Sequence, residues 1–361
     1  MVNEKFLLIT DSPLGDTGYS SVGKELMKML KGKYELYYGG LQYIGKPIQI
    51  DDYKLLSFAS LSNSADSLDM IGKVDHILYL RNTWASSMQS DPVRLVRAYS
   101  DDIIMYSPVE ERFLPKRFFN GLKGFDKINN WYDRIITMTK SGVDSILEHG
   151  IESDYLYHNL IEDKLCRKHY DNIEHNVLNI SYSVDYRKNI GMYILFSKNF
   201  NDFNFNWLGL SQYYVIPDYL EIYGVKNFHI INQHKHYSSF KFLSNEQISQ
   251  IYGQHNFYIQ MSFKEGFDLT TLEALSNGLI TFMPNDQLHK ELFYDYPNAI
   301  FVSGSYDYPA MNQLEYFIPI ENWIDVFAEN KDRKKMGINV KDRFKFESVR
   351  EKLLKILSKG V

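Results

Sequence analysis

The chain has 361 residues, of which 44% are hydrophobic, and its formal net charge is −5. This length predicts two domains with sizeable cores, and the acidic balance gives no general reason to expect a nucleic-acid partner. No apolar run reaches the roughly 18 residues that a membrane span needs, and the lone cysteine, Cys166, excludes an internal disulfide.

The N-terminal part alternates between short apolar runs and an amphipathic stretch. Residues 6–10 and 34–38 predict strands, and residues 20–31 predict a helix between them. The loop before this helix therefore lies at the carboxyl end of a strand, where sheets of this kind bind ligands. It contains Gly18 but no complete G-x-G-x-x-G, so we expect no nicotinamide or flavin cofactor.

The same alternation continues through the first half of the chain. Strands are expected at 77–80, 103–106 and 134–139, and helices at 92–99 and 140–149. We expect the loops after these strands to open onto one crevice. Glu110 follows the second of these strands and is the acidic candidate for chemistry there.

Residues 164–175 are mostly charged and polar, and we interpret them as a link to a second α/β domain. In that domain, strands are expected at 177–182, 205–209, 228–231 and 279–284. A last amphipathic helix is expected at 341–359, with an apolar face made of Val349, Leu353, Ile356 and Leu357. We assign the first domain to 1–168, the second to 176–340 and the terminal helix to 341–361.

The stretch 257–278 combines a strand, a polar turn and a helix that opens near Leu269 and stops at Gly278. Glu265 lies on the turn, and Glu273 lies on the helix, eight residues later. Between them, the start of the helix offers unpaired N–H groups and the positive end of its dipole. Two carboxylates around an anion site suit a nucleotide-sugar, which has hydroxyls at both ends and phosphate in the middle. The alternative is a surface loop and an ordinary amphipathic helix.

Glu265-Gly266-Phe267 with Glu273-Ala274-Leu275 resembles the E-x7-E signature of the retaining, GT-B-fold glycosyltransferases of family 4, also called glycosyltransferase group 1. Other segments resemble motifs of this family in the same order: the glycine loop at 17–19, the Y-x-P-V-(D/E) turn at 106–110 and the phosphate loop at 183–190. The resemblance implies two doubly wound Rossmann-like α/β domains that face a central cleft. It also implies that the C-terminal helix returns to the first domain.

The resemblance assigns roles to residues of this chain. It implies that Glu273 holds the ribose hydroxyls, that Glu265 holds the sugar hydroxyls, and that Lys188 stabilises the leaving diphosphate. The other implied donor-binding residues are Gly266, Phe267, Asp268, Leu269, Thr270, Thr271, Gly18, Arg187 and Ser183. For Gly18, a tight turn that needs glycine is an equal alternative.

The chain departs from the family pattern at two places. Ser183 stands where the family has an arginine, and Arg187 is out of register, so the usual arginine–lysine pair is incomplete. No histidine matches the family's histidine in the first domain, because His76 precedes its strand. The predicted catalytic residues are therefore Glu265, Lys188 and Glu110.

The resemblance implies a glycosyltransferase that transfers a sugar from a nucleotide-diphospho-sugar donor to an unknown acceptor with retention of configuration. The lone cysteine fits a reducing cytoplasm, so we expect a cytoplasmic protein. The resemblance also implies no metal and no tightly bound cofactor, because Lys188 and a helix N-terminus can neutralise the diphosphate. A nucleotide-sugar epimerase, a non-catalytic nucleotide-sugar-binding protein and a transferase acting on modified DNA bases are the alternatives.

The acceptor class stays open among glycans, lipids, proteins and small molecules, and the acidic net charge argues against nucleic acid. The basic side of the last helix carries Lys352, Lys355 and Lys359. We interpret this side as a solvated surface, with a peripheral membrane contact as the alternative.

Overall fold

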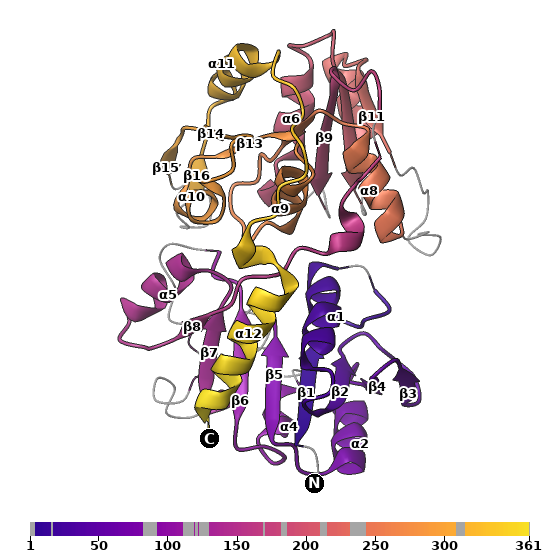
Figure 1. Ribbon diagram of the computed structural model, residues 1–361, viewed down its shortest axis with the longest axis vertical. Coiled ribbons are helices and arrows are strands. Elements are labelled where there is room, and N and C mark those ends of the chain that lie inside the picture. The colour runs from indigo at the N-terminus through magenta and orange to yellow at the C-terminus, as the bar shows by residue number, and fades with distance from the viewer. Residues whose placement is uncertain are drawn as a thin grey trace. The chain divides into compact units, whose positions relative to one another are not determined.

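The structure is a computed structural model that describes residues 4–15, 17–81, 92–110, 119, 122, 130–168, 170–181, 186–209, 215–231, 243–307 and 315–360. The chain forms two compact units, of which the first comprises Met1–Asn159 and Arg343–Val361 and the second comprises Leu160–Asp342. Each unit is built on its own, largely parallel sheet (Figure 1). The predicted architecture of two Rossmann-like α/β domains is therefore confirmed.

The first unit contains an eight-stranded sheet in the order β3-β4-β2-β1-β5-β6-β7-β8, in which only the edge strand β3 is antiparallel to its neighbour. The strands are β1 (Lys5–Thr10), β2 (Glu35–Gly40), β3 (Ile48–Ile50), β4 (Tyr53–Ser57), β5 (His76–Leu80), β6 (Ile103–Ser107), β7 (Arg134–Thr137) and β8 (Asp154–Tyr155). The helices are α1 (Gly18–Leu30), α2 (Leu61–Ile71), α4 (Val93–Val96), α5 (Lys140–Leu147) and α12 (Phe346–Leu357), which η6 (Ser358–Gly360) follows. The central strands are buried throughout, as is typical of a parallel sheet with helices on both faces.

The second unit contains a six-stranded, all-parallel sheet in the order β11-β10-β9-β12-β13-β14. Its strands are β9 (Asn176–Ser181), β10 (Asn204–Gly209), β11 (Phe228–Ile230), β12 (Phe257–Ile259), β13 (Ile280–Pro284) and β14 (Ala299–Val302), and β15 (Ser305–Asp307) pairs with β16 (Glu315–Phe317) in a separate ribbon. The helices are η2 (Glu162–Lys164), η3 (Tyr186–Lys188), α6 (Ile190–Ser197), α7 (Val215–Tyr223), α8 (Asn245–Gly253), α9 (Leu269–Ser276), α10 (Gln287–Phe293) and α11 (Ile320–Asn330). A short helix, η5 (Asp342–Phe344), precedes α12.

An aromatic cluster fills the core of the second unit. Phe327 of α11 is fully buried, and its ring centroid lies 4.7 Å from that of Phe200, 5.1 Å from that of Phe282 and 5.3 Å from that of Phe257. Such ring pairs stabilise a core beyond the area that they bury. Phe257 begins β12, so this cluster anchors the strand that leads into the stretch around Glu265.

The terminal helix α12 packs beside α1 on the first unit (Figure 1), as the fold prediction requires. Its buried face is the predicted one and consists of Val349, Leu353, Ile356 and Leu357. Arg350 Nε donates a hydrogen bond to the carbonyl oxygen of Met29 in α1 (2.9 Å). Arg134 Nη1 in β7 donates to the carbonyl oxygen of Ile356 (2.9 Å). Apolar burial and these two polar contacts together hold the helix on the first unit.

The basic side of α12 lies partly against the first unit. Lys352 lies over the ring of Tyr155, and Lys359 forms an ion pair with Asp154 (2.7 Å). Lys355 is exposed. Lys359 is exposed as well, so two of the three lysines are solvated, as the sequence analysis interprets them, and Lys352 is partly buried. In the part of the chain that the structure describes, no helix is both long and apolar enough to span a membrane.

Several element predictions differ from the structure. The predicted helix at 92–99 is only α4, one turn long. The strands β3 and β4 and the helix α2 were not predicted from the sequence. A tight turn through Asp51, which has φ 45°, joins β3 to β4 in a hairpin. Short strands around such a turn and a helix rich in serine and aspartate give little hydrophobic periodicity.

Candidate active site

The Glu265 loop, residues 260–268, connects β12 to α9 in the second unit. Asp268 is the N-cap residue of α9, with φ 63° and ψ 66°, and its Oδ1 accepts a hydrogen bond from the Thr271 N–H (3.2 Å). Aspartate is among the few residues other than glycine that tolerate this left-handed conformation. After the helix, Gly278 has φ 82°, and a Cβ there would lie 2.0 Å from the carbonyl oxygen of Met336. The helix therefore starts at Leu269 and stops before Gly278, as predicted.

The structure brings Glu265 and Lys188 together, although they lie 77 residues apart in the sequence. Lys188 Nζ forms an ion pair with Glu265 Oε1, and both side chains are largely buried. Arg187 Nη1 lies 4.0 Å from Glu265 Oε2. The N–H group of Phe263 donates to the carbonyl oxygen of Arg187 (2.9 Å), which ties the loop to η3. One carboxylate thus faces two cations, of which the lysine makes the direct contact.

Glu273, the second glutamate of the pair, is held by two partners. Its Oε1 lies 2.5 Å from Lys164 Nζ, and its Oε2 accepts a hydrogen bond from Tyr252 Oη (2.9 Å). The Glu273 side chain is 6% exposed and the Lys164 side chain is 12% exposed, so this ion pair is largely shielded from water. Burial and the neighbouring Glu273 carboxylate both raise the pKa of Tyr252, which keeps its hydroxyl protonated and able to donate.

Asn277 fixes the segment that supplies Lys164. Its Nδ2 donates to the carbonyl oxygen of Lys164 (3.1 Å), and its Oδ1 accepts from the N–H group of Cys166 (2.7 Å). Asn277 lies one helical turn after Glu273, so both contacts join the same face of α9 to the same segment. The stretch interpreted as an interdomain link is therefore part of the candidate site in the second unit.

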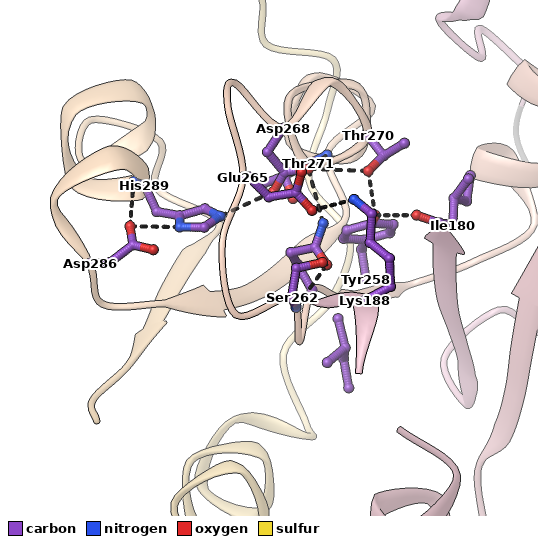
Figure 2. A network of polar contacts seen from close by, with 12 residues as sticks. Ile180, Lys188, Tyr258, Ser262, Glu265, Asp268, Thr270, Thr271, Asp286 and His289 are labelled. Carbon is purple, nitrogen blue, oxygen red and sulfur yellow. Dashed lines mark hydrogen bonds and ion pairs between the residues drawn. The ribbon is translucent and has the colours of Figure 1, made fainter. Parts of the chain in front are cut away.

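Asp268 is the centre of a buried polar network (Figure 2). Its Oδ1 accepts hydrogen bonds from Gln260 Nε2 (3.0 Å) and Thr270 Oγ1 (3.2 Å) as well as from Thr271. Its Oδ2 lies 3.1 Å from His289 Nε2. The other ring nitrogen of His289 lies 2.7 Å from Asp286 Oδ1. The imidazole of α10 thus bridges two carboxylates, each of which caps a helix.

His289 is protonated in this arrangement. Its side chain is fully buried, which by itself lowers its pKa, but Asp286 and Asp268 outweigh the burial and raise the pKa to about 10. Burial likewise raises the pKa of Asp268, and the hydrogen bond from His289 reverses that effect, so the pKa lies below its usual range. The Asp286–His289–Asp268 chain is therefore a buried carboxylate–imidazolium–carboxylate network.

The start of α9 presents backbone donors in the position that the resemblance implies. Within the described residues, the N–H groups of Gly266, Leu269 and Thr270 have no hydrogen-bond partner in the chain. Phe267 is buried, and Thr271 Oγ1 is buried without a partner among the described residues. Thr270 Oγ1 accepts from Tyr258 Oη (2.8 Å). These donors lie between Glu265 and Glu273 in sequence, at the positive end of a helix dipole.

Gly18 in the first unit is the first residue of α1. It does not have a positive φ, and a Cβ at this position would meet no atom of the described residues within 4 Å. The backbone therefore does not demand glycine here, which removes the tight-turn explanation. Thr17 caps the helix, since its Oγ1 accepts from the Ser20 N–H (3.0 Å) and donates to Asp11 Oδ2 (2.7 Å).

The remaining site residues predicted from the sequence are Glu110 and Ser183. Glu110 lies just after β6 and is partly buried. Ser183 lies outside the described residues. His158 is buried beside Tyr106 Oη (3.0 Å) and Met138 Sδ (3.2 Å), and burial lowers its pKa to about 3. A histidine that stays neutral in this setting has a structural role. Contrary to prediction, His76 does not precede its strand but is the first residue of β5, and its Nδ1 lies 2.6 Å from Asp102 Oδ2.

Sequence reasoning missed four members of the site: Lys164, Tyr252, Gln260 and His289. Lys164 and Glu273 lie 109 residues apart, and no local pattern joins them. Tyr252 lies in an amphipathic helix and Gln260 follows an apolar strand, and both patterns predict only packing. The signal that remained was Asp268 itself, since a carboxylate that caps a buried helix requires a compensating partner.

The chain resembles solved structures over its whole length. A sucrose-phosphate synthase from Thermosynechococcus elongatus superposes with a TM-score of 0.71 at 10% identity and covers 99% of each chain. HepE from Anabaena, in complex with UDP and glucose, gives 0.68 at 10% identity, over 99% of this chain and 100% of that one. WaaG, a glycosyltransferase involved in lipopolysaccharide biosynthesis, gives 0.65 at 12% identity, over 98% and 100%.

In sequence, no protein-family model and no curated protein matches this chain. The superpositions establish the fold, whereas identities of 10–12% leave the family open. Both units nevertheless take part in each superposition, because the alignments cover nearly all of this chain. The chain therefore has the GT-B fold.

Proposed function

We propose that this protein is a nucleotide-sugar-dependent glycosyltransferase of the retaining, family 4 type. One observation carries the proposal: Glu265 and Glu273 flank unpaired backbone N–H groups at the start of α9, and each glutamate pairs with a buried lysine. The fold is shared with the glycosyltransferase WaaG and with HepE, which has been solved with UDP-glucose and with UDP and glucose. Hydroxyl-binding carboxylates around a phosphate-binding centre suit such a donor.

Glu273 would bind the ribose. Lys164 and Tyr252 each occupy one side of its carboxylate, and an ionised carboxylate has about four acceptor sites on its two oxygens, so it can still accept from two ribose hydroxyls. The two partners also hold the carboxylate in one orientation before the nucleotide arrives, which reduces the ordering cost of binding.

Glu265 and Lys188 would act on the sugar and the diphosphate. Glu265 accepts from sugar hydroxyls, and Lys188 shares its charge between Glu265 and the phosphate oxygens. The N–H groups of Gly266, Leu269 and Thr270, at the start of α9, meet the charge that grows on the leaving diphosphate. Arg187 lies close enough to Glu265 to add a second cation.

The transfer itself follows the retaining course. The acceptor oxygen attacks the anomeric carbon on the face from which the diphosphate leaves. The bond between that carbon and the diphosphate oxygen breaks, and this oxygen takes the acceptor proton. No protein nucleophile is needed, and Lys188 with the helix dipole replaces a divalent ion. Activity should therefore persist in excess EDTA, and a loss that manganese restores would contradict this part of the proposal.

The first unit would hold the acceptor. Glu110 and Gly18 both follow strands at the carboxyl edge of its sheet, where α/β sheets bind ligands. We propose that the backbone at Gly18 approaches donor phosphate, since no atom of the described residues lies within 4 Å of where a Cβ would be. Glu110 is the acidic group that we propose to orient the acceptor hydroxyl. Protein, glycan, lipid and small-molecule acceptors all fit this description.

A non-catalytic nucleotide-sugar-binding protein is the second candidate. The observation that favours it is Ser183 in place of the family's arginine, which leaves Lys188 as the principal cation. A GT-B-fold epimerase would differ from both, because it changes the donor without an acceptor. Product analysis after incubation with the donor alone separates an epimerase from a transferase, and a binding protein leaves the donor unchanged.

Calorimetric titration with UDP, ADP and GDP, followed by the matching sugar donors, tests the proposal. Glu273→Gln should weaken the binding of the preferred diphosphate by about tenfold or more, because it removes a charged acceptor of ribose hydroxyls. Glu265→Gln should leave diphosphate affinity nearly unchanged and weaken the intact donor or its turnover. Equal diphosphate affinity in the wild type and Glu273→Gln would refute the ribose assignment.

A further inference from the structure

A buried carboxylate lies at the N-terminus of the helix that we propose to bind a diphosphate. The Asp268 side chain is 1% exposed, and it caps α9 directly after the Glu265 loop. Removing a carboxylate from water is costly unless cations and donors compensate for it. Its charge also opposes the positive potential that a helix N-terminus offers to an anion. Asp268 therefore needs a partner for folding and a neutralising charge for binding.

His289 supplies Asp268 with both the partner and the neutralising charge. Its Nε2 lies 3.1 Å from Asp268 Oδ2, and its Nδ1 lies 2.7 Å from Asp286 Oδ1. Asp286 also caps α10, because its Oδ1 accepts from the His289 N–H (2.8 Å). The ring is consequently fixed at both nitrogens, and its side chain is fully buried. Figure 2 shows this chain of contacts on the opposite side of Asp268 from Thr270.

The contact between His289 and Asp268 affects diphosphate binding because Lys188, the cation that we propose to meet the phosphate, lies near Asp268. The charge of Lys188 also acts on Asp268, although its direct partner is Glu265. If His289 did not neutralise Asp268, that carboxylate would attract the Lys188 ammonium more strongly. Lys188 would then be drawn away from Glu265 and from an arriving phosphate.

We propose that His289 is a positioning residue of the Glu265 loop: it holds Asp268 in the left-handed N-cap of α9 and offsets its charge, so that Lys188 and the N–H groups at the start of α9 remain available to a nucleoside diphosphate. This inference rests on the proposed function. It places a buried ionic chain behind the site, where His289 itself touches neither the diphosphate nor the sugar.

A double-mutant cycle tests the inference. His289→Gln removes the charge and leaves Asp268 uncompensated. Asp268→Asn removes the need for that charge, while asparagine still caps a helix and tolerates a positive φ. Calorimetry with UDP, ADP and GDP gives the Kd of each variant, and thermal unfolding confirms that each is folded.

We expect His289→Gln to raise the Kd of the preferred diphosphate about tenfold, and the double variant Asp268→Asn/His289→Gln to return it to within about twofold of Asp268→Asn alone. His255→Gln is the matched control. His255 is another buried histidine of the second unit, and its Nδ1 contacts the carbonyl oxygen of Ile251 (2.6 Å), away from the Glu265 loop. This control should lower the melting temperature and leave the Kd unchanged.

Each outcome decides the inference. A folded His289→Gln variant with wild-type Kd would overturn it, as would a double variant as weak as His289→Gln. A Kd that rises equally in His255→Gln would show that general destabilisation explains the effect. If the wild type bound none of the three diphosphates, the proposed function would fail first and this inference with it, and that result is distinct from the other three.

Discussion

The chain places a helix N-terminus after a parallel strand in each unit, and the two ends differ in their charges. At α1, Thr17 caps the helix, and the nearby carboxylate of Asp11 accepts hydrogen bonds from the neutral donors Thr17 Oγ1 (2.7 Å) and Gln42 Nε2 (2.9 Å). At α9, the cap is a carboxylate, and the three acidic side chains around it each contact a cation: Asp268 with His289, Glu265 with Lys188 and Glu273 with Lys164.

The difference shows what the fold supplies and what the side chains add. A Rossmann-like unit supplies unpaired N–H groups and a helix dipole wherever a helix follows a strand. Among the described residues of these two helix starts, only the one in the second unit is surrounded by largely buried cations that are paired with carboxylates. Such a cation can be shared between its carboxylate and an arriving phosphate, because most of its own desolvation has already taken place. The proposed division of labour, with the donor in the second unit and the acceptor in the first, follows from this contrast.

The largest effect should come from Lys188. Lys188→Met keeps the aliphatic stem and removes the charge next to the leaving diphosphate. It should cost roughly 3–4 kcal/mol in the transition state, a loss of about 10²–10³ in kcat, by analogy with the loss of one preorganised donor. Steady-state kinetics with the preferred donor measures the loss, and circular dichroism shows whether the fold is retained.

Lys188→Arg is the matched control for this prediction. Its planar fork keeps the charge but does not replace a point charge at the same place, so it should restore only part of the rate. If Lys188→Met were folded and turned the donor over at the wild-type rate, Lys188 would merely balance Glu265. The contrast between the two helix ends would then have no catalytic meaning. Arg187 would become the candidate for stabilising the leaving diphosphate.

Local sequence patterns predicted the parts of the site that lie on one continuous segment. Glu265, Glu273 and Gly278 lie within one strand–loop–helix unit, whose spacing is set by the backbone. Lys164 and His289 could not be predicted in this way, because they reach the site only through packing of η2 and α10 against α9 or its cap. The fold was predictable because alternating apolar runs determine parallel sheets, whereas buried ion pairs depend on tertiary contacts.

Two buried histidines, one in each unit, should respond to pH in opposite directions. The pKa of His289 is raised from 6.5 to about 10, because Asp286 and Asp268 overcome the effect of burial. Its stabilising contribution is therefore complete below pH 6.5 and is lost as the pH rises through about 10. The pKa of His158 is lowered to about 3 by burial. Its contribution is complete above pH 6.5 and is lost as the pH falls toward 3.

Denaturant unfolding of the wild type, His289→Gln and His158→Gln between about pH 5 and about pH 9 measures both contributions. The difference in unfolding free energy between the wild type and His289→Gln should shrink toward high pH, by at most about 1.4 kcal/mol per pH unit. The difference for His158→Gln should shrink toward low pH. A gap for His289→Gln that widened from neutral to alkaline pH would contradict the buried imidazolium.

The smallest effect should come from the neutral cap at α1. Thr17→Ala removes the hydrogen bond to the Ser20 N–H and should lower the stability of the first unit by about 1 kcal/mol. Thr139 caps α5 of the same unit, since its Oγ1 accepts from the Gly142 N–H (3.1 Å), and Thr139→Ala should cost about as much. If the α1 end contacts donor phosphate as we propose, only Thr17→Ala should also raise the donor KM, because it alone loosens the backbone at Gly18. Unfolding and kinetics on both variants make the comparison. Equal KM values in Thr17→Ala and Thr139→Ala would remove Gly18 from the proposed site. Of the two helix starts compared, only that of α9 would then bind the donor.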